Sequence, residues 1–104
     1  MTAVEVRVTQ YEVSAVPEGN INHPHFVIRV EYRGDGKWAV VRHCQCLSAS
    51  GEWSVELRSS SREDEWLAEH RFDLETALRL AREAALKITV NGWTVQDVLN
   101  QKEK

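Results

Sequence analysis

The chain has 104 residues, with 13 Lys and Arg against 16 Asp and Glu, a formal net charge of −3 and a pI near 5.8. These values predict one domain of ordinary size and exclude a strongly basic nucleic-acid module, although a local basic patch stays open. No run reaches the ~18 apolar residues that span a bilayer, and the first residues do not resemble a secretory signal. Two cysteines, Cys44 and Cys46, are too few for a disulfide framework, so we expect a reduced, cytoplasmic protein.

Apolar and polar residues alternate through the first half of the chain, which is typical of half-buried strands. Val4, Val6 and Val8 fall on one face of a predicted first strand, whereas Tyr11 and Val13 have the opposite parity. This change means either a β-bulge between the two sets or a strand that switches the face it buries. Proline, glycine and asparagine residues then predict a loop.

The clearest strand covers 25–33, where four side chains share one apolar face: Phe26, Ile28, Val30 and Tyr32. Glycines on both sides of Asp35 separate it from an apolar run over 37–47, which predicts a second strand and a hairpin. We expect a three-residue loop, because it unites the apolar faces of both strands. That register places Tyr32 opposite Trp38, Val30 opposite Val40, Arg33 opposite Lys37 and Phe26 opposite Cys44.

The next predicted strand covers 52–58, after a turn over 48–51. A two-residue turn at Ser50 and Gly51 pairs Cys46 with Val55 and Cys44 with Leu57. The apolar face then continues across three strands, interrupted only by Arg42.

The second half predicts helices. Polar residues over 59–65 predict a flexible loop, and alternation from Trp66 to Phe72 predicts a fifth strand. Asp73 is a good N-cap for a helix whose apolar residues keep helical spacing from Leu74 to Ile88. A short extended piece, a turn at 91–92 and a helix starting near Thr94 follow, and 100–104 forms a fraying tail.

The predicted fold is therefore one α+β domain over 1–104. An antiparallel meander of four to five strands carries one long helix packed on one face, and a short C-terminal helix follows.

The histidines and cysteines raise the question of a metal site. His23, His25, His43, Cys44 and Cys46 are the right ligand types for zinc. On a strand, however, His43 points away from the two cysteines, and no C-x-x-C or H-x-x-x-H spacing occurs. Packed thiols and surface histidines are the favoured interpretation. The sequence also contains no recognisable nucleophile, base or cofactor motif, so we expect no enzyme and no cofactor.

One helix can cover only one face of the sheet, which directs attention to the second face. We expect an apolar strip of Val27, Val41 and Leu47 there, unless the N-terminal strand folds across it. The candidate partner-binding residues are Val27, Arg29, Arg33, Val41, His43, Arg58 and Trp93. Such a face suits a protein partner or a second copy of the chain.

Nucleic-acid binding is the alternative use of this face. Three strands followed by a helix over 37–87 resemble integrase arm-type DNA-binding domains, which lay such a sheet in the major groove. Glu31 and Glu56 oppose the electrostatic attraction to phosphate that this use requires, and a solvated face of mixed charge is also open.

Four tryptophans are many for this length. Trp38, Trp53 and Trp66 have core parity, whereas Trp93 precedes a helix cap. Trp93 either staples the C-terminal helix to the body, which we favour, or is an exposed anchor for a partner.

Residues 66–99 also carry a resemblance, in the segments Phe-Asp-Leu-Glu-Thr-Ala-Leu and Ile-Thr-Val-Asn-Gly-Trp-Thr. They resemble the C-terminal part of small uncharacterised proteins of actinobacteria and their phages, which implies no activity but favours a small accessory protein that acts by binding. We therefore expect a non-enzymatic protein-interaction module that uses the open sheet face, with DNA or RNA binding as the alternative and no membrane partner.

Overall fold

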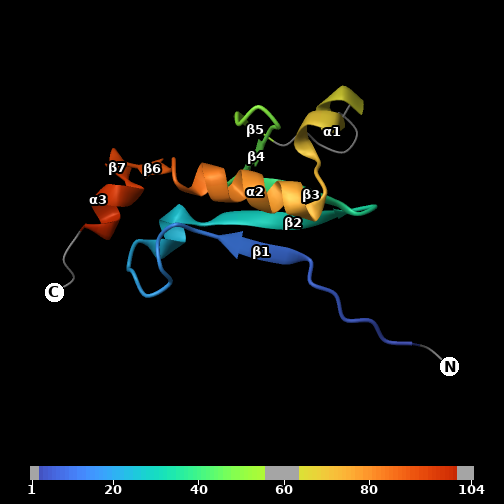
Figure 1. Ribbon diagram of the computed structural model, residues 1–104, viewed down its shortest axis with the longest axis horizontal. Coiled ribbons are helices and arrows are strands. Elements are labelled where there is room, and N and C mark those ends of the chain that lie inside the picture. The colour runs from blue at the N-terminus through green and yellow to red at the C-terminus, as the bar shows by residue number, and fades with distance from the viewer. Residues whose placement is uncertain (1–2, 56–63, 101–104) are drawn as a thin grey trace.

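The computed structural model describes residues 3–55 and 64–100, and five strands form one antiparallel sheet in sequential order. The strands are β1 (Gln10–Val13), β2 (Ile28–Gly34), β3 (Lys37–Arg42), β4 (Gln45–Leu47) and β5 (Trp53–Val55). Helix α2 (Leu74–Ala85) lies along one face of this sheet and contacts β1, β2 and β3 (Figure 1). The predicted α+β class, with a long helix on the sheet and a short C-terminal helix, is confirmed.

Helix α2 begins where the sequence predicts. The Asp73 side chain accepts a hydrogen bond from the backbone N–H of Thr76, which satisfies one of the free donors of the first turn. Ala77, Ala81 and Ala85 are buried at a spacing of four residues, so the helix approaches the sheet closely.

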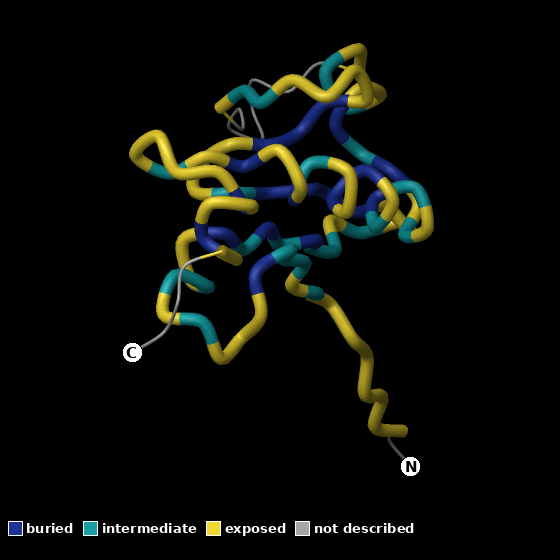
Figure 2. Tube along the Cα trace, turned by 60° about the vertical axis from the view of Figure 1, so that its left-hand side comes forward, coloured by how far each residue is buried: buried dark blue, intermediate teal, exposed yellow. Residues whose placement is uncertain are grey.

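The main core lies between α2 and the sheet (Figure 2). Its most buried large side chains are Val16, Phe26, Ile28, Val30, Val40 and Leu47. Trp38 packs between two tyrosines, with ring centroids 5.6 Å from Tyr11 and 5.2 Å from Tyr32. Its backbone also exchanges two hydrogen bonds with Phe72, which ties the start of α2 to the sheet.

The β2–β3 hairpin has the predicted core register. Tyr32 lies opposite Trp38, and Val30 lies opposite Val40. The predicted loop is wrong by one residue, because Gly34 and not Arg33 lies opposite Lys37. The turn itself has two residues, Asp35 and Gly36, both with positive φ, and a bulge at Arg33 restores the register.

The predicted strand over 37–47 is wrong, because the chain turns at His43 and Cys44 and forms two antiparallel strands. His43 has a φ of 56°, the left-handed region that continuous strands do not use. The turn reverses the side-chain parity of β4 relative to a continuous strand. Leu47 therefore lies in the main core, whereas Cys46 lies on the opposite face of the sheet.

The predicted cysteine pairings are also wrong, because the connection between β4 and β5 covers 48–52 and shifts their register by one residue from that of the predicted two-residue turn. Cys46 lies opposite Ser54, not Val55, and Cys44 is exposed in the turn. Phe26 cannot pair with Cys44, because it ends the 3₁₀ helix η1 (His23–Phe26). The predicted partner of Cys44, Leu57, lies outside the described residues.

The predicted strand over 66–72 is also wrong. Helix α1 (Asp64–His70) takes its place, and only Phe72 keeps a bridge to the sheet. The predicted loop over 59–65 lies mostly outside the described residues, but its last two residues begin α1. Trp66 and His70 fit a strand pattern because they are an even number of residues apart, but a spacing of four also suits one side of a helix. Their rings stack there, with centroids 4.2 Å apart.

The predicted strand at Val4, Val6 and Val8 is wrong as well. Residues 3–8 belong to no strand pair, Thr9 accepts one backbone hydrogen bond from Tyr32 of β2, and β1 begins at Gln10. In the register of β1 with β2, Thr9 lies opposite Tyr32 and β2 ends two residues later at Gly34, so no residue of β2 lies opposite Val4 or Val6. Tyr11 and Val13 pack against the core, and the three valines do not fold across the second face.

The C-terminal elements follow the prediction. Strands β6 (Thr89–Val90) and β7 (Trp93–Thr94) form a hairpin, and α3 (Val95–Leu99) follows directly. The buried Ile88 lies beyond the end of α2. Within the described ranges, no helix has the length and apolar character needed to cross a membrane.

Candidate interaction surfaces

The second face of the sheet carries an ion-paired row on β2. Glu31 accepts hydrogen bonds from Arg29 Nε and Arg33 Nη1, each at 2.8 Å. Burial by itself raises the pKa of Glu31, but the hydrogen bonds and charges of Arg33 and Arg29 outweigh it and hold that pKa below its ordinary value. Both guanidinium groups are therefore engaged by a carboxylate on their own strand.

The apolar strip expected on this face is absent. Val41 is only 6% exposed, because Trp66 of α1 packs against the cluster formed by Ala39, Val41 and Cys46. Leu47 belongs to the other face, where it is buried in the main core. Helix α1, which the sequence analysis predicts as a strand, therefore covers part of the second face, which was expected to be open.

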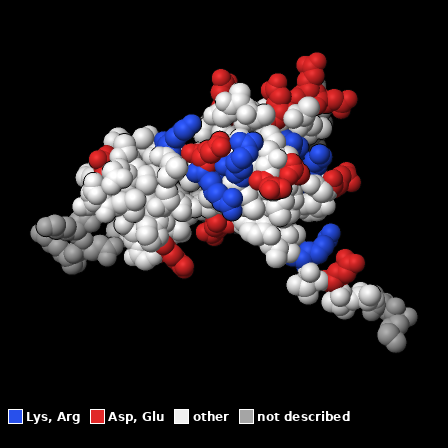
Figure 3. Space-filling view, viewed as in Figure 1, with Lys and Arg blue, Asp and Glu red and all other residues white. Residues whose placement is uncertain are grey.

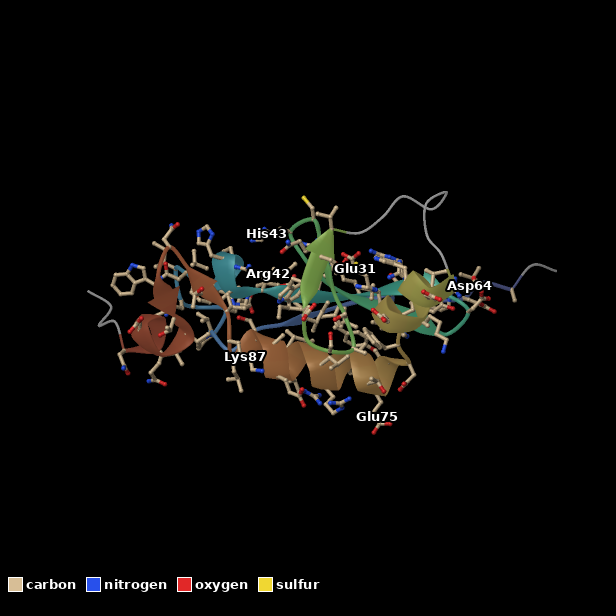
Figure 4. All side chains as sticks on the ribbon, turned by 90° about the horizontal axis from the view of Figure 1, so that it is seen from above. Glu31, Arg42, His43, Asp64, Glu75 and Lys87 are labelled. Atoms are coloured by element: carbon tan, nitrogen blue, oxygen red, sulfur yellow. The ribbon has the colours of Figure 1, made fainter. Side chains whose placement is uncertain are left out.

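The other predicted site residues are placed as follows. Arg29 of β2 lies opposite Val41 of β3. Val27 is half-buried directly before β2, and His43 is exposed in the β3–β4 turn, on the side of the sheet away from α2 (Figure 4). Arg58 lies outside the described residues.

The histidines and cysteines do not converge either. His23 Nδ1 lies 2.7 Å from the carbonyl oxygen of Val16 and must donate to it, since a carbonyl only accepts. His70 is buried with Nδ1 2.8 Å from the Trp66 carbonyl oxygen and Nε2 3.2 Å from Ser54 Oγ, so it holds α1 against β5. Within residues 3–55 and 64–100, no three His, Cys, Asp or Glu side chains form a group that could hold a metal ion.

A groove forms where η1 meets the β6–β7 hairpin and α3. Trp93 lines it from β7, together with Asn22, His25, Phe26, Val90, Asn91 and Val98. Trp93 keeps 48% of its surface exposed, whereas Phe26 and Val98 form a buried floor. We call these seven residues the Trp93 groove.

Trp93 has features of both predicted roles, a staple for the C-terminal helix and an exposed anchor for a partner. It directly precedes the N-cap Thr94, and Val98 is the fourth residue of α3, which is the spacing of a hydrophobic staple. Both residues line the same groove. About half of the Trp93 surface nevertheless remains in contact with water.

Local structure holds Trp93 in place from both sides. Asn91 and Gly92 both have positive φ, the geometry of the tight hairpin turn that aligns β6 with β7. On the other side, Thr94 and Asp97 form a reciprocal capping box: Thr94 Oγ1 accepts from the Asp97 N–H and Asp97 accepts from the Thr94 N–H. The hydrogen bonds from Thr94 lower the pKa of Asp97.

Charge is distributed unevenly over the molecule. In Figure 3 the acidic and basic side chains gather over α2 and the neighbouring elements, and the end formed by β6, β7 and α3 is mostly uncharged. Among the residues that line the Trp93 groove, only His25 can carry a charge. The groove therefore suits an uncharged ligand segment.

Sequence reasoning identified Trp93 but missed the rest of the groove. Asn22, His25 and Phe26 lie about 70 residues away in sequence, and they reach Trp93 because η1 contacts β6. Asn22 lies in a segment predicted as a loop, His25 lies at the start of the strand predicted over 25–33, and no local pattern marks either as a groove residue.

The comparisons with known proteins add no relative. No protein-family model, no curated protein and no solved structure matches the chain. The resemblance of residues 66–99 to actinobacterial and phage proteins stays an expectation.

Proposed function

We propose that this chain is a non-enzymatic protein-interaction module, and that the Trp93 groove is its binding site. The observation that carries the proposal is the half-exposed Trp93 ring beside a preformed groove, at an end of the fold that has few charged side chains in Figure 3. Tryptophan is enriched among the few residues that supply most of the energy in protein interfaces. Neither Cys44 nor Cys46 takes part in a disulfide, which supports a reducing compartment such as the cytoplasm.

The partner that fits this groove is an uncharged, extended peptide segment with one large apolar side chain. The buried floor of Phe26 and Val98 offers an apolar contact, and the Trp93 ring offers a flat wall. Asn91 also lines the groove, and an exposed asparagine amide can both donate to and accept from the backbone of an extended peptide.

Rigidity supports the same proposal. The turn at 91–92 and the capping box fix the backbone on both sides of Trp93, so little backbone entropy is lost when a partner binds. A peptide-binding site on a preformed scaffold needs less interaction energy than one that must fold first.

A displayed library of random twelve-residue peptides tests this function. We expect wild-type protein to enrich uncharged peptides with a shared aromatic or large aliphatic position, and the Trp93→Ser variant to lose binding to them at least tenfold. Leu86→Ser is the matched control, because Leu86 is 70% exposed but lies outside the groove. Failure to enrich any peptide, or equal loss in both variants, would contradict the proposal. So would salt-sensitive binding to a labelled DNA duplex that depends on Arg29 and Arg33.

A further inference from the structure

The N-terminal segment 3–9, which we call the arm, projects away from the folded body (Figures 1 and 2). Its three valines are 61–95% exposed, although Val4, Val6 and Val8 alternate with polar residues as in a strand with one apolar face. Exposed alternating valines in an extended segment are favourable partners for another strand. The arm thus has the sequence of a strand, but only Thr9, at its end, is hydrogen-bonded to β2.

The edge next to the arm is also unpaired. β1 is an edge strand of the sheet, and Tyr32 N–H donates to the Thr9 carbonyl oxygen at 2.9 Å. Hydrogen-bonded residues alternate along an antiparallel pair, so the backbone groups of Gln10 and Glu12 point away from β2. If the arm continues β1, the backbone groups of its even-numbered residues point toward the same free edge.

We propose that the occupant of this edge is a second copy of the chain, and that the two arms pair antiparallel with Val6 opposite Val6. In that register Val4 lies opposite Val8 of the second copy, and Glu5 lies opposite Arg7 of the second copy. All six valines then share one face of the ribbon. Two Glu–Arg pairs lie on its other face, where opposite charges across strands stabilise the pairing.

The neighbouring symmetric registers are less favourable. A shift by two residues in one direction places Arg7 opposite Arg7, and the same shift in the other direction places Glu5 opposite Glu5. Like charges directly opposite each other destabilise a strand pair. A shift by four residues places Val4 opposite the charged Glu12. The sequence of the arm is therefore complementary to itself in one register.

This dimer is anchored at both ends by folded structure. Each arm continues into β1, which is held by β2 and by the Tyr11–Trp38 ring contact. An isolated two-stranded ribbon is marginal in water, but here each strand extends from a five-stranded sheet. The proposal uses a different surface from the Trp93 groove and does not depend on it.

Charge reversal tests the pairing. By sedimentation velocity we expect wild-type protein at high micromolar concentration to have twice the chain mass of 11.9 kDa. E5R alone and R7E alone should each weaken the dimer at least tenfold, because each leaves four like charges facing one another. An equimolar mixture of the two variants should restore the dimer, since each chain then supplies the charges that the other lacks. Trp93→Ser should leave the dimer unchanged.

Cysteine cross-linking tests the register. In a C44S background, V6C should form an interchain disulfide on mild oxidation, because hydrogen-bonded opposite residues lie about 5.5 Å apart at Cα. V4C is the matched control: its two copies lie about four residues apart along the ribbon and should not cross-link. A wild-type chain that stays monomeric overturns the proposal. A dimer that is insensitive to both charge variants, or one in which V4C cross-links as well as V6C, also overturns it.

Discussion

Trp38 and Trp93 have opposite roles in this account, and their removal should have opposite consequences. Trp38 is 8% exposed, contacts the rings of Tyr11 and Tyr32, and exchanges two backbone hydrogen bonds with Phe72. Trp38→Ala should lower the free energy of unfolding by about 3–5 kcal/mol, the usual cost of truncating a buried tryptophan. A domain of this size has about 5–15 kcal/mol of total stability, so the variant should be largely destabilised.

Trp93→Ala should cost no more than about 2 kcal/mol, because roughly half of its surface already meets water. Urea unfolding followed by far-UV circular dichroism measures both values without relying on tryptophan fluorescence. The ring contact itself can be isolated with a double-mutant cycle of Trp38 and Tyr11, where we expect a coupling energy of about 0.5–1.5 kcal/mol. If Trp93→Ala destabilised the protein as much as Trp38→Ala, the assignment of one ring to the core and the other to binding would be refuted.

Three further predictions follow from the packing, the turns and the caps. Leu80→Ala should lower the free energy of unfolding in urea by about 2–4 kcal/mol, because Leu80 is buried on the sheet-facing side of α2. Leu86→Ala should change it by less than about 0.5 kcal/mol, because Leu86 is exposed. Similar values for the two variants would contradict the placement of the helix. Gly92→Ala should lower the free energy of unfolding by about 1–2 kcal/mol, because the backbone φ of +82° is strained for alanine even though a Cβ would meet no neighbouring atom. The same substitution should weaken peptide binding. An unchanged Tm and an unchanged peptide affinity would argue against a fixed hairpin. The hydrogen bonds from Thr76 lower the pKa of Asp73. The stabilisation that they supply is therefore present above the unfolded-state pKa and is lost as pH falls through the folded-state pKa. Asp73→Asn keeps the cap but should flatten that part of the curve of stability against pH, and an unaltered acid slope would contradict the prediction.

Sequence patterns predicted the fold where a local signal determines the structure. Asp73 and Thr94 act through side chains that cap the helix immediately following them, so both helix starts were predicted correctly. The pairing of Tyr32 with Trp38 was also predictable, because only that register unites the apolar faces of β2 and β3.

The errors arose where the outcome depends on what lies nearby in space. The turn at His43 carries no glycine, and it reverses the side-chain parity of β4 relative to a continuous strand. The pattern from Trp66 to Phe72 alternates like a strand, but packing of Trp66 on the second face of the sheet selects a helix. Val4 to Val8 have a strand pattern, yet a strand requires a neighbour, and in its register with β1 the strand β2 ends before it reaches Val6 and Val4.

The candidate site was predictable only in part. Trp93 was identified as unusual because it follows a turn and precedes a cap. The other side of the groove comes from η1, whose position depends on a long-range contact with β6. The sequence predicts only one helix on the sheet and therefore favours the second sheet face as the binding site. Helix α1 covers part of that face instead.

The most direct test of the proposed function is a nitrogen-edited NMR titration of the wild-type chain with a peptide selected from the library. The four indole N–H groups of the protein report separately on its four tryptophans. We predict that the Trp93 indole and the backbone signals of Asn91 and Val98 shift on binding, while the Trp38 indole stays in place. Shifts that fall instead on Arg29 and Arg33, with an unchanged Trp93 indole, would place binding on the sheet and contradict the account.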